Sequence, residues 1–200
     1  MARRSHSAQT YLRESIAQLA ARFMAEGIED FAQAKRKAAR QLGAPDTRNL
    51  PDNREIEQAL RVYQALYQGE VQIEVLRKLR SQALPVMQEL EDFNPLLIGS
   101  VDRGTATAYS NIDLMLFVDS QKEVEIALLN RKRAYTVGEK RFRFSDGVRR
   151  VPVLLLSQYD GADVQLAIFA PADLRHMPLS PIDGRALSGS GLEEVRAWVE

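Results

Sequence analysis

Two short polar segments in the middle of this chain carry the residue types that phosphate and metal chemistry requires. Residues 99–104 read Gly-Ser-Val-Asp-Arg-Gly, and residues 110–114 read Ser-Asn-Ile-Asp-Leu. Side chains of a strand alternate between its two faces, so in a strand Asn111 and Asp113 point the same way. A Gly-Ser bend offers backbone N–H groups and a hydroxyl to an anion, and side-chain oxygens are the ligands that magnesium prefers. Together the segments predict a site for a phosphate group and a divalent cation.

At this spacing the two segments resemble the signature of the polymerase-β-like nucleotidyltransferase superfamily, most closely that of its small bacterial members. The resemblance covers roughly residues 94–170. It implies transfer of a nucleoside monophosphate from a nucleoside triphosphate to a hydroxyl, assisted by magnesium ions. The acceptor is left open between a protein side chain, a small molecule and an RNA end. By the same resemblance Gly99, Ser100, Arg103 and Gly104 contribute to binding the phosphates.

The metal ligands implied by the resemblance depart from the family pattern. Asp113 matches one ligand, but Asn111 stands where the family has a second carboxylate. For a third ligand, Gln165 matches by its apolar flanks, while Asp163 shares its face of the strand and is the alternative. An amide oxygen coordinates magnesium without bringing charge. Magnesium is therefore expected to bind weakly here, and nucleotide binding is easier to retain than fast transfer.

Each of these residues also has a purely structural interpretation. Asp113 is a polar residue that could cap the helix that follows its strand, and Asp163 could complete a hairpin at Asp160–Gly161. Gln165 could be a hydrogen-bonded amide in the core. The sequence therefore supports two hypotheses for the chain: a metal-dependent nucleotidyltransferase, and a catalytically degenerate module of that fold that binds a nucleotide or a macromolecular partner.

The elements that must position these residues follow from periodicity. Apolar residues recur at helical spacing through the first ninety residues, and Asp52 with Glu55 forms the pattern of a capping box. Pro85 lies inside the fourth helical pattern and predicts a kink or break near Leu84. From residue 94 the pattern changes to short strands. Strands are expected at 96–98, 113–118, 134–137, 140–144, 151–156 and 163–169, with helices at 120–131 and 192–199.

These patterns predict an α+β fold: a small mixed sheet with an N-terminal helical extension. The helical region is expected over residues 1–93, and the nucleotidyltransferase-like core with a C-terminal tail over residues 94–200. Lys140, Arg141 and Arg143 alternate with Phe142 and Phe144. This alternation fits a half-buried strand better than a base-stacking platform, although the basic residues could also face a polyanionic substrate.

Composition limits the classes of partner. Lys plus Arg equals Asp plus Glu, 27 each, so no net charge attracts the chain to nucleic acid or to an anionic membrane. The absence of cysteine excludes disulfides and thiolate metal sites. No apolar run approaches the roughly 20 residues of a membrane span, and the basic start lacks the apolar region of a secretory signal. A cytoplasmic protein with no membrane partner is therefore expected.

Overall fold

The computed structural model describes residues 2–159 and 161–200, with side chains for 9–158 and 161–200. Its architecture is α+β, as predicted. The described chain forms two compact units, which we call the helical unit and the sheet unit. The helical unit holds the chain up to Ile73 with Thr107–Tyr109 and Pro181–Asp183; the sheet unit holds Glu74–Ala106, Ser110–Ser180 and Gly184–Glu200.

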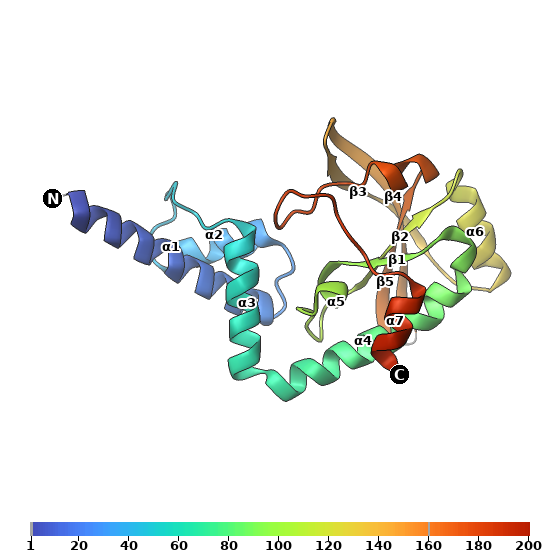
Figure 1. Ribbon diagram of the computed structural model, residues 1–200, viewed down its shortest axis with the longest axis horizontal. Coiled ribbons are helices and arrows are strands. Elements are labelled where there is room, and N and C mark those ends of the chain that lie inside the picture. The colour runs from blue at the N-terminus through green and yellow to red at the C-terminus, as the bar shows by residue number, and fades with distance from the viewer. Residues whose placement is uncertain (1, 160) are drawn as a thin grey trace. The chain divides into compact units, whose positions relative to one another are not determined.

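The helical unit contains helices α1 (Ala2–Ala25), α2 (Phe31–Gln41) and α3 (Asn53–Tyr67) (Figure 1). The predicted capping box is confirmed at the start of α3. The Asp52 carboxylate accepts from the Glu55 N–H at 2.9 Å, and the Glu55 carboxylate accepts from the Asp52 N–H at 2.6 Å. The three helices enclose a core of their own that includes Ile16, Ile56 and Leu60.

Helix α4 (Gly69–Glu89) begins in the helical unit and continues into the sheet unit. Of the kink or break expected near Leu84, the break does not occur, because the helix continues through Pro85 to Glu89. Proline removes one backbone hydrogen bond from a helix. The next two residues, Val86 and Met87, are almost completely buried in the core of the sheet unit, and this burial offsets the loss. The boundary between the two units in α4 lies after Ile73. The change of periodicity in the sequence suggested instead that the helical region ends at residue 93.

The strands of the described chain form one mixed sheet in the order β1-β2-β5-β4-β3. Their bounds are β1 Leu96–Ile98, β2 Ile112–Phe117, β3 Thr136–Phe144, β4 Gly147–Tyr159 and β5 Ala162–Phe169. Strands β2 and β5 are parallel, and the other neighbours are antiparallel. The two strands predicted within 134–144 are one strand, β3, because β4 pairs with it continuously from Thr136 to Phe144.

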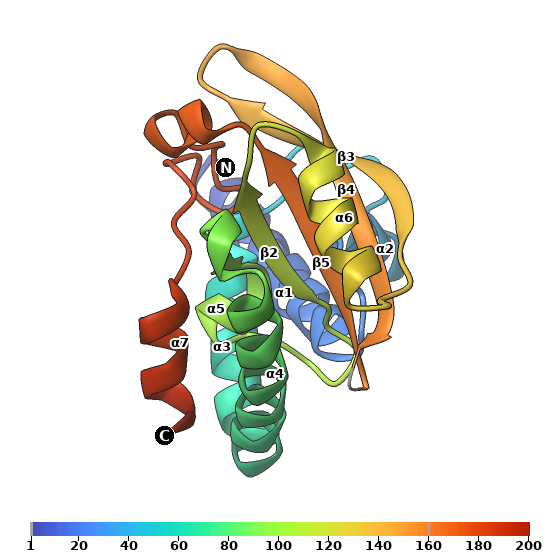
Figure 2. The ribbon, with the colours of Figure 1, turned by 90° about the vertical axis from the view of Figure 1, so that its right-hand side faces the viewer.

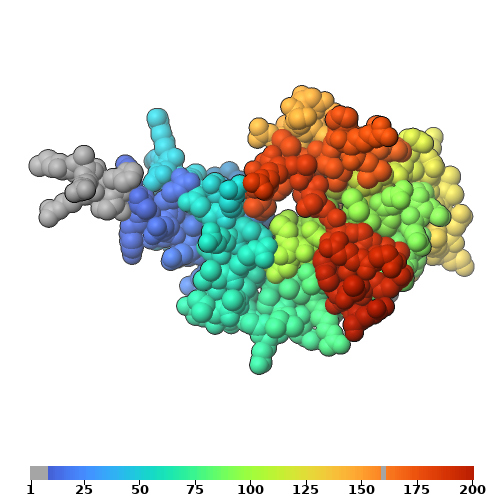
Figure 3. All heavy atoms as spheres, viewed as in Figure 1, coloured from blue at the N-terminus to red at the C-terminus, as the bar shows by residue number. Residues whose placement is uncertain are grey.

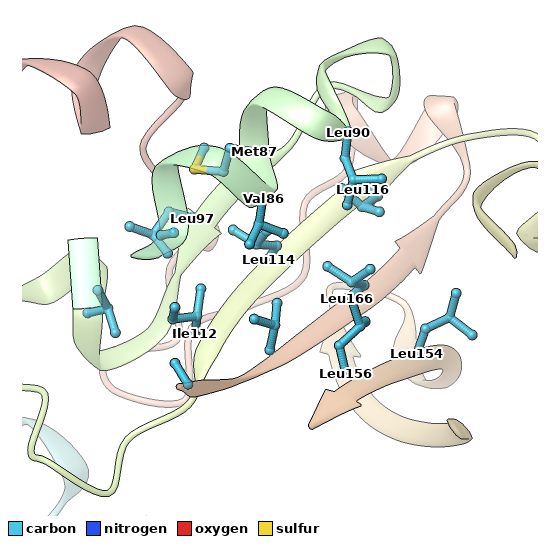
Figure 4. Close-up of a cluster of buried hydrophobic side chains, with 14 of the residues drawn as sticks. Val86, Met87, Leu90, Leu97, Ile112, Leu114, Leu116, Leu154, Leu156 and Leu166 are labelled. Atoms are coloured by element: carbon cyan, nitrogen blue, oxygen red, sulfur yellow. The ribbon is translucent and has the colours of Figure 1, made fainter. Parts of the chain in front are cut away.

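One face of the sheet is covered by helices. Helices α4, α6 (Gln121–Asn130) and α7 (Leu192–Val199) contribute buried residues to the core on this face (Figure 2). Figure 4 shows Val86 of α4 and Leu90, which directly follows α4, beside Leu114 and Leu116 of β2. The space-filling view shows α7 (red) on the surface of the sheet unit (Figure 3).

The opposite face, which we call the site face, carries the alternate residues of the same strands. Its apolar part is a cluster of large side chains: Met115, Phe117, Phe144, Val153 and Phe169. Asp113, Gln165 and Lys140 share this face by strand alternation. The remaining short elements are the 3₁₀ turns η1 (Glu91–Phe93) and η2 (Pro171–Arg175) and the helix α5 (Gly99–Arg103). Among the residues described, no helix is both long and apolar enough to span a membrane.

Candidate functional site

Asp113 is held in place by two neighbouring strands. It is the second residue of β2, opposite Ile98 of antiparallel β1 and Gln165 of parallel β5. Its side chain keeps 24% of its accessible surface. Burial raises the pKa of Asp113, while the positive charges of Lys140 and Arg103 act in the opposite direction. The carboxylate therefore lies at the edge of the core with two cations near it.

The Gly-Ser segment and this carboxylate do converge. Gly99 has a φ of +82°, a left-handed conformation that favours glycine. A Cβ added to Gly99 would lie 2.8 Å from Asp113 Oδ2 and 3.4 Å from Asp113 Cβ. The absence of a side chain at position 99 is thus what leaves room for the carboxylate.

Residues 99–103 form a one-turn helix, α5, rather than a simple bend. Gly104 closes the helix with a φ of +80°, and its N–H donates to the Ser100 carbonyl. Arg80 of α4 fixes the segment from the other side, because its guanidinium donates to the Val101 carbonyl at 3.3 and 3.4 Å. These hydrogen bonds fix the position of the segment. The roles of Gly99, Ser100, Arg103 and Gly104 in binding phosphate remain predictions.

Gln165 lies next to Asp113 and has a hydrogen bond across the sheet. Its side chain is half-buried, and Oε1 accepts from Lys140 Nζ at 3.4 Å. The same ammonium is 3.6 Å from Asp113 Oδ1. Lys140 belongs to β3, so its side chain reaches across β4 to arrive at β5 and β2. The structure therefore adds to the site a cation that the sequence motif did not include.

Asp163 and Asn111 have different surroundings from Asp113. Asp163 is exposed, and its carboxylate accepts from the Gln158 N–H at 2.8 Å, which fits the hairpin interpretation. Asp160, the other residue of that interpretation, lies outside the described residues. Asn111 is half-buried and directly precedes β2, which begins at Ile112. Its role as a ligand remains a prediction.

The donors around Asp113 do not fit a pair of magnesium ions. In residues 9–158 and 161–200, no three His, Cys, Asp or Glu side chains are grouped closely enough to hold a metal. Magnesium requires oxygen ligands near 2.1 Å in an octahedron, and here one carboxylate is joined by amides and an ammonium. At about 4 Å, a divalent and a monovalent cation repel by about 2 kcal/mol in water and about 8 kcal/mol at a dielectric constant of about 20. A magnesium ion between Asp113 and Gln165 would have to displace Lys140.

Two other basic residues of the β3–β4 hairpin, Arg149 and Arg150, have partners away from Asp113. Arg149 forms ion pairs with Asp146 at 2.6 Å and Asp173 at 3.1 Å, and stacks on the Phe144 ring. Arg150 lies opposite Arg141 and 3.5 Å from Glu139. These contacts favour the half-buried strand of the sequence interpretation, and Lys140 is the basic residue of the hairpin that contacts Asp113 and Gln165.

In comparisons with known proteins, no family model, no curated protein and no solved structure matches this chain.

Proposed function

We propose that the chain is a nucleotidyltransferase-like module that binds a nucleoside triphosphate at Asp113 and the α5 segment, with transfer activity weak or lost. The observation that supports this most directly is the contact between the Gly99 backbone and the Asp113 carboxylate. It joins the two halves of the motif where β1 ends and β2 begins in the mixed sheet. The opposite face of that sheet is filled by helices. The nucleotide itself comes from the resemblance of residues 94–170 to the nucleotidyltransferase signature.

The charges favour binding over transfer. Burial raises the pKa of Asp113, and the positive charges of Lys140 and Arg103 oppose this rise, so both cations can help to balance the phosphates of a ligand. Transfer needs a metal that activates the acceptor hydroxyl, and that metal depends on protein carboxylates. With amides at 111 and 165, the site lacks the negative charge for that ion. Losing one well-placed electrostatic group typically costs about 10²–10³ in rate.

Calorimetric titration of the full chain with each of the four nucleoside triphosphates tests binding. We expect saturable binding of at least one nucleotide, weakened by Arg103→Gln beside the carboxylate. Arg150→Gln is the matched control, because Arg150 is exposed on β4 and paired with Glu139 away from the site. Absence of heat with all four nucleotides, confirmed by unchanged protein NMR signals, contradicts the proposal.

A second assay separates the module from the active enzyme. Transfer of label from α-labelled triphosphates to protein, RNA and small-molecule acceptors is expected to be slow in the wild type. Asn111→Asp returns a carboxylate to the position where the family has one, so transfer should rise above the wild-type rate when magnesium is present. Rapid transfer by the wild type, with no gain in the variant, would instead support the metal-dependent enzyme.

A further inference from the structure

We propose that the Lys140 ammonium is the resident cation of this site, and that the site binds the phosphates of its ligand without a divalent metal. This inference rests on the proposed function and specifies how the ligand is held. The motif implies magnesium, but the side chains that the structure places around Asp113 do not suit that ion.

The position of the ammonium is the first observation. Lys140 Nζ lies 3.6 Å from Asp113 Oδ1 and 3.4 Å from Gln165 Oε1. These two residues are direct neighbours in the parallel pair β2–β5, and they stand at two of the positions that the motif assigns to metal ligands. The ammonium thus lies beside both side chains that the motif would use to hold a metal.

The path of the side chain is the second observation. Lys140 starts on β3, two strands away from Gln165, and reaches its partners across β4. A lysine at the edge of a sheet can extend freely into water and gains rotamer entropy there. Here it keeps 49% of its side-chain surface exposed while its amino group faces the Asp113 carboxylate. The negative charge of Asp113 therefore sets the orientation of the Lys140 side chain.

The lengths of its contacts are the third observation. Charge-assisted hydrogen bonds of an ammonium are normally about 2.7–2.9 Å long. Both contacts of Lys140 are longer, and an ammonium carries three N–H donors. Asp113 and Gln165 therefore orient the ammonium without saturating it. A phosphate oxygen entering beside Arg103 would be its third and strongest acceptor.

The experiment compares two adjacent residues of one strand. Lys140→Gln removes the cation from the site face, and Arg141→Gln removes one from the opposite face of β3. Each is titrated with ATP, GTP and inorganic tripolyphosphate, first in EDTA and then with magnesium. Binding of tripolyphosphate alone would identify the phosphates as the recognised group, and tighter binding of a nucleotide would identify a nucleoside contribution.

We expect the wild type and Arg141→Gln to bind in EDTA with similar affinity. Lys140→Gln should lose about tenfold or more in EDTA, because a hydrogen bond to a charged group is lost, and should regain affinity with magnesium. Wild-type binding that requires magnesium, or equal affinities of the two variants in EDTA, would overturn the inference. Absence of binding in both buffers would instead refute the proposed function on which it rests.

Manganese alone provides a readout that needs no nucleotide. Paramagnetic broadening of amide signals around Asp113 should be weak in the wild type and stronger in Lys140→Gln, where the competing cation is gone. Strong broadening in the wild type, unchanged by the substitution, would show that the lysine and the metal do not compete and would also overturn the inference. The Trp198 fluorescence spectrum confirms that each variant is folded.

Discussion

The contact between Gly99 and Asp113 predicts the outcome of one small substitution. Gly99→Ala places a methyl group 2.8 Å from Asp113 Oδ2 in a residue whose φ is +82°. The substitution therefore has two separate costs. One is the strain of a side chain in the left-handed region, and the other is the displacement of the carboxylate.

The magnitudes can be separated. A left-handed conformation costs a residue with a Cβ about 1–2 kcal/mol. Overpacking costs about 1–3 kcal/mol, and the low end applies because a carboxylate can rotate away. We therefore expect Gly99→Ala to lower the free energy of unfolding by about 2–3 kcal/mol. Rotation of the carboxylate also breaks its approach to Lys140, so ligand binding should weaken together with stability.

Two controls isolate the contact. Gly184 belongs to the sheet unit, has a φ of +71° and has nothing within 4 Å of an added Cβ. Gly184→Ala therefore carries the strain alone, about 1–2 kcal/mol. In an Asp113→Ala background, Gly99→Ala should likewise cost only the strain, so the double-mutant cycle should show a coupling of about 1 kcal/mol.

Urea denaturation followed by fluorescence suits this measurement. Trp198 is the single tryptophan of the sequence, lies in α7 and packs on the core of the sheet unit, so its signal reports that unit. If Gly99→Ala costs no more than Gly184→Ala, or if the Asp113→Ala background leaves its cost unchanged, Gly99 and the Asp113 carboxylate do not approach each other closely.

Two further predictions concern the sheet unit. Burial raises the pKa of Asp102 above its ordinary value of 3.8, so protonation of this carboxyl favours the folded state. Asp102→Asn, which cannot ionise, should be more stable than the wild type at pH 7, and this advantage should disappear below pH 3.8 in urea titrations across pH. A Cβ on Gly189 would lie 2.6 Å from the Leu97 carbonyl oxygen, whereas one on Gly191 meets nothing within 4 Å. Gly189→Ala should therefore destabilise the fold by about 1–3 kcal/mol, and Gly191→Ala should cost less. Ser190 and Leu97 of β1 exchange two backbone hydrogen bonds of 2.9 Å, and equal costs would contradict this pairing.

Most of the fold could be predicted because its signals are local. The capping box at Asp52 needs only residues three positions apart, and helices and strands follow from the period of the apolar residues. The break that Pro85 suggested near Leu84 does not occur, because Val86 and Met87 pack against residues that are distant in the sequence. A helix that packs on a sheet tolerates one missing hydrogen bond, and that packing is not visible in a local window.

The candidate site likewise combines features that follow from local sequence with features that depend on distant parts of the chain. Gly99 and Asp113 are fourteen positions apart, and helix α5 with the segment that leads into β2 brings them together, as the motif anticipates. Lys140 is absent from that motif because its approach depends on the strand order. The sequence shows that Lys140 and Phe142 share a face, but not that β3 pairs with β4 and β4 with β5. Without that order, a lysine on an edge strand cannot be assigned to a carboxylate on β2.

The amides and the lysine are best understood as one electrostatic arrangement. Three carboxylates at one point repel each other strongly unless divalent cations neutralise them, and such a site cannot also admit an ammonium held close to the same oxygens. Beside Asp113 the structure has the Gln165 amide, which carries no charge, and one ammonium is enough to balance the single carboxylate of this pair. The amide and the ammonium are therefore compatible with each other. It follows that restoring the carboxylate at Asn111 should restore a metal site only in part while Lys140 remains, because the lysine still competes for Asp113.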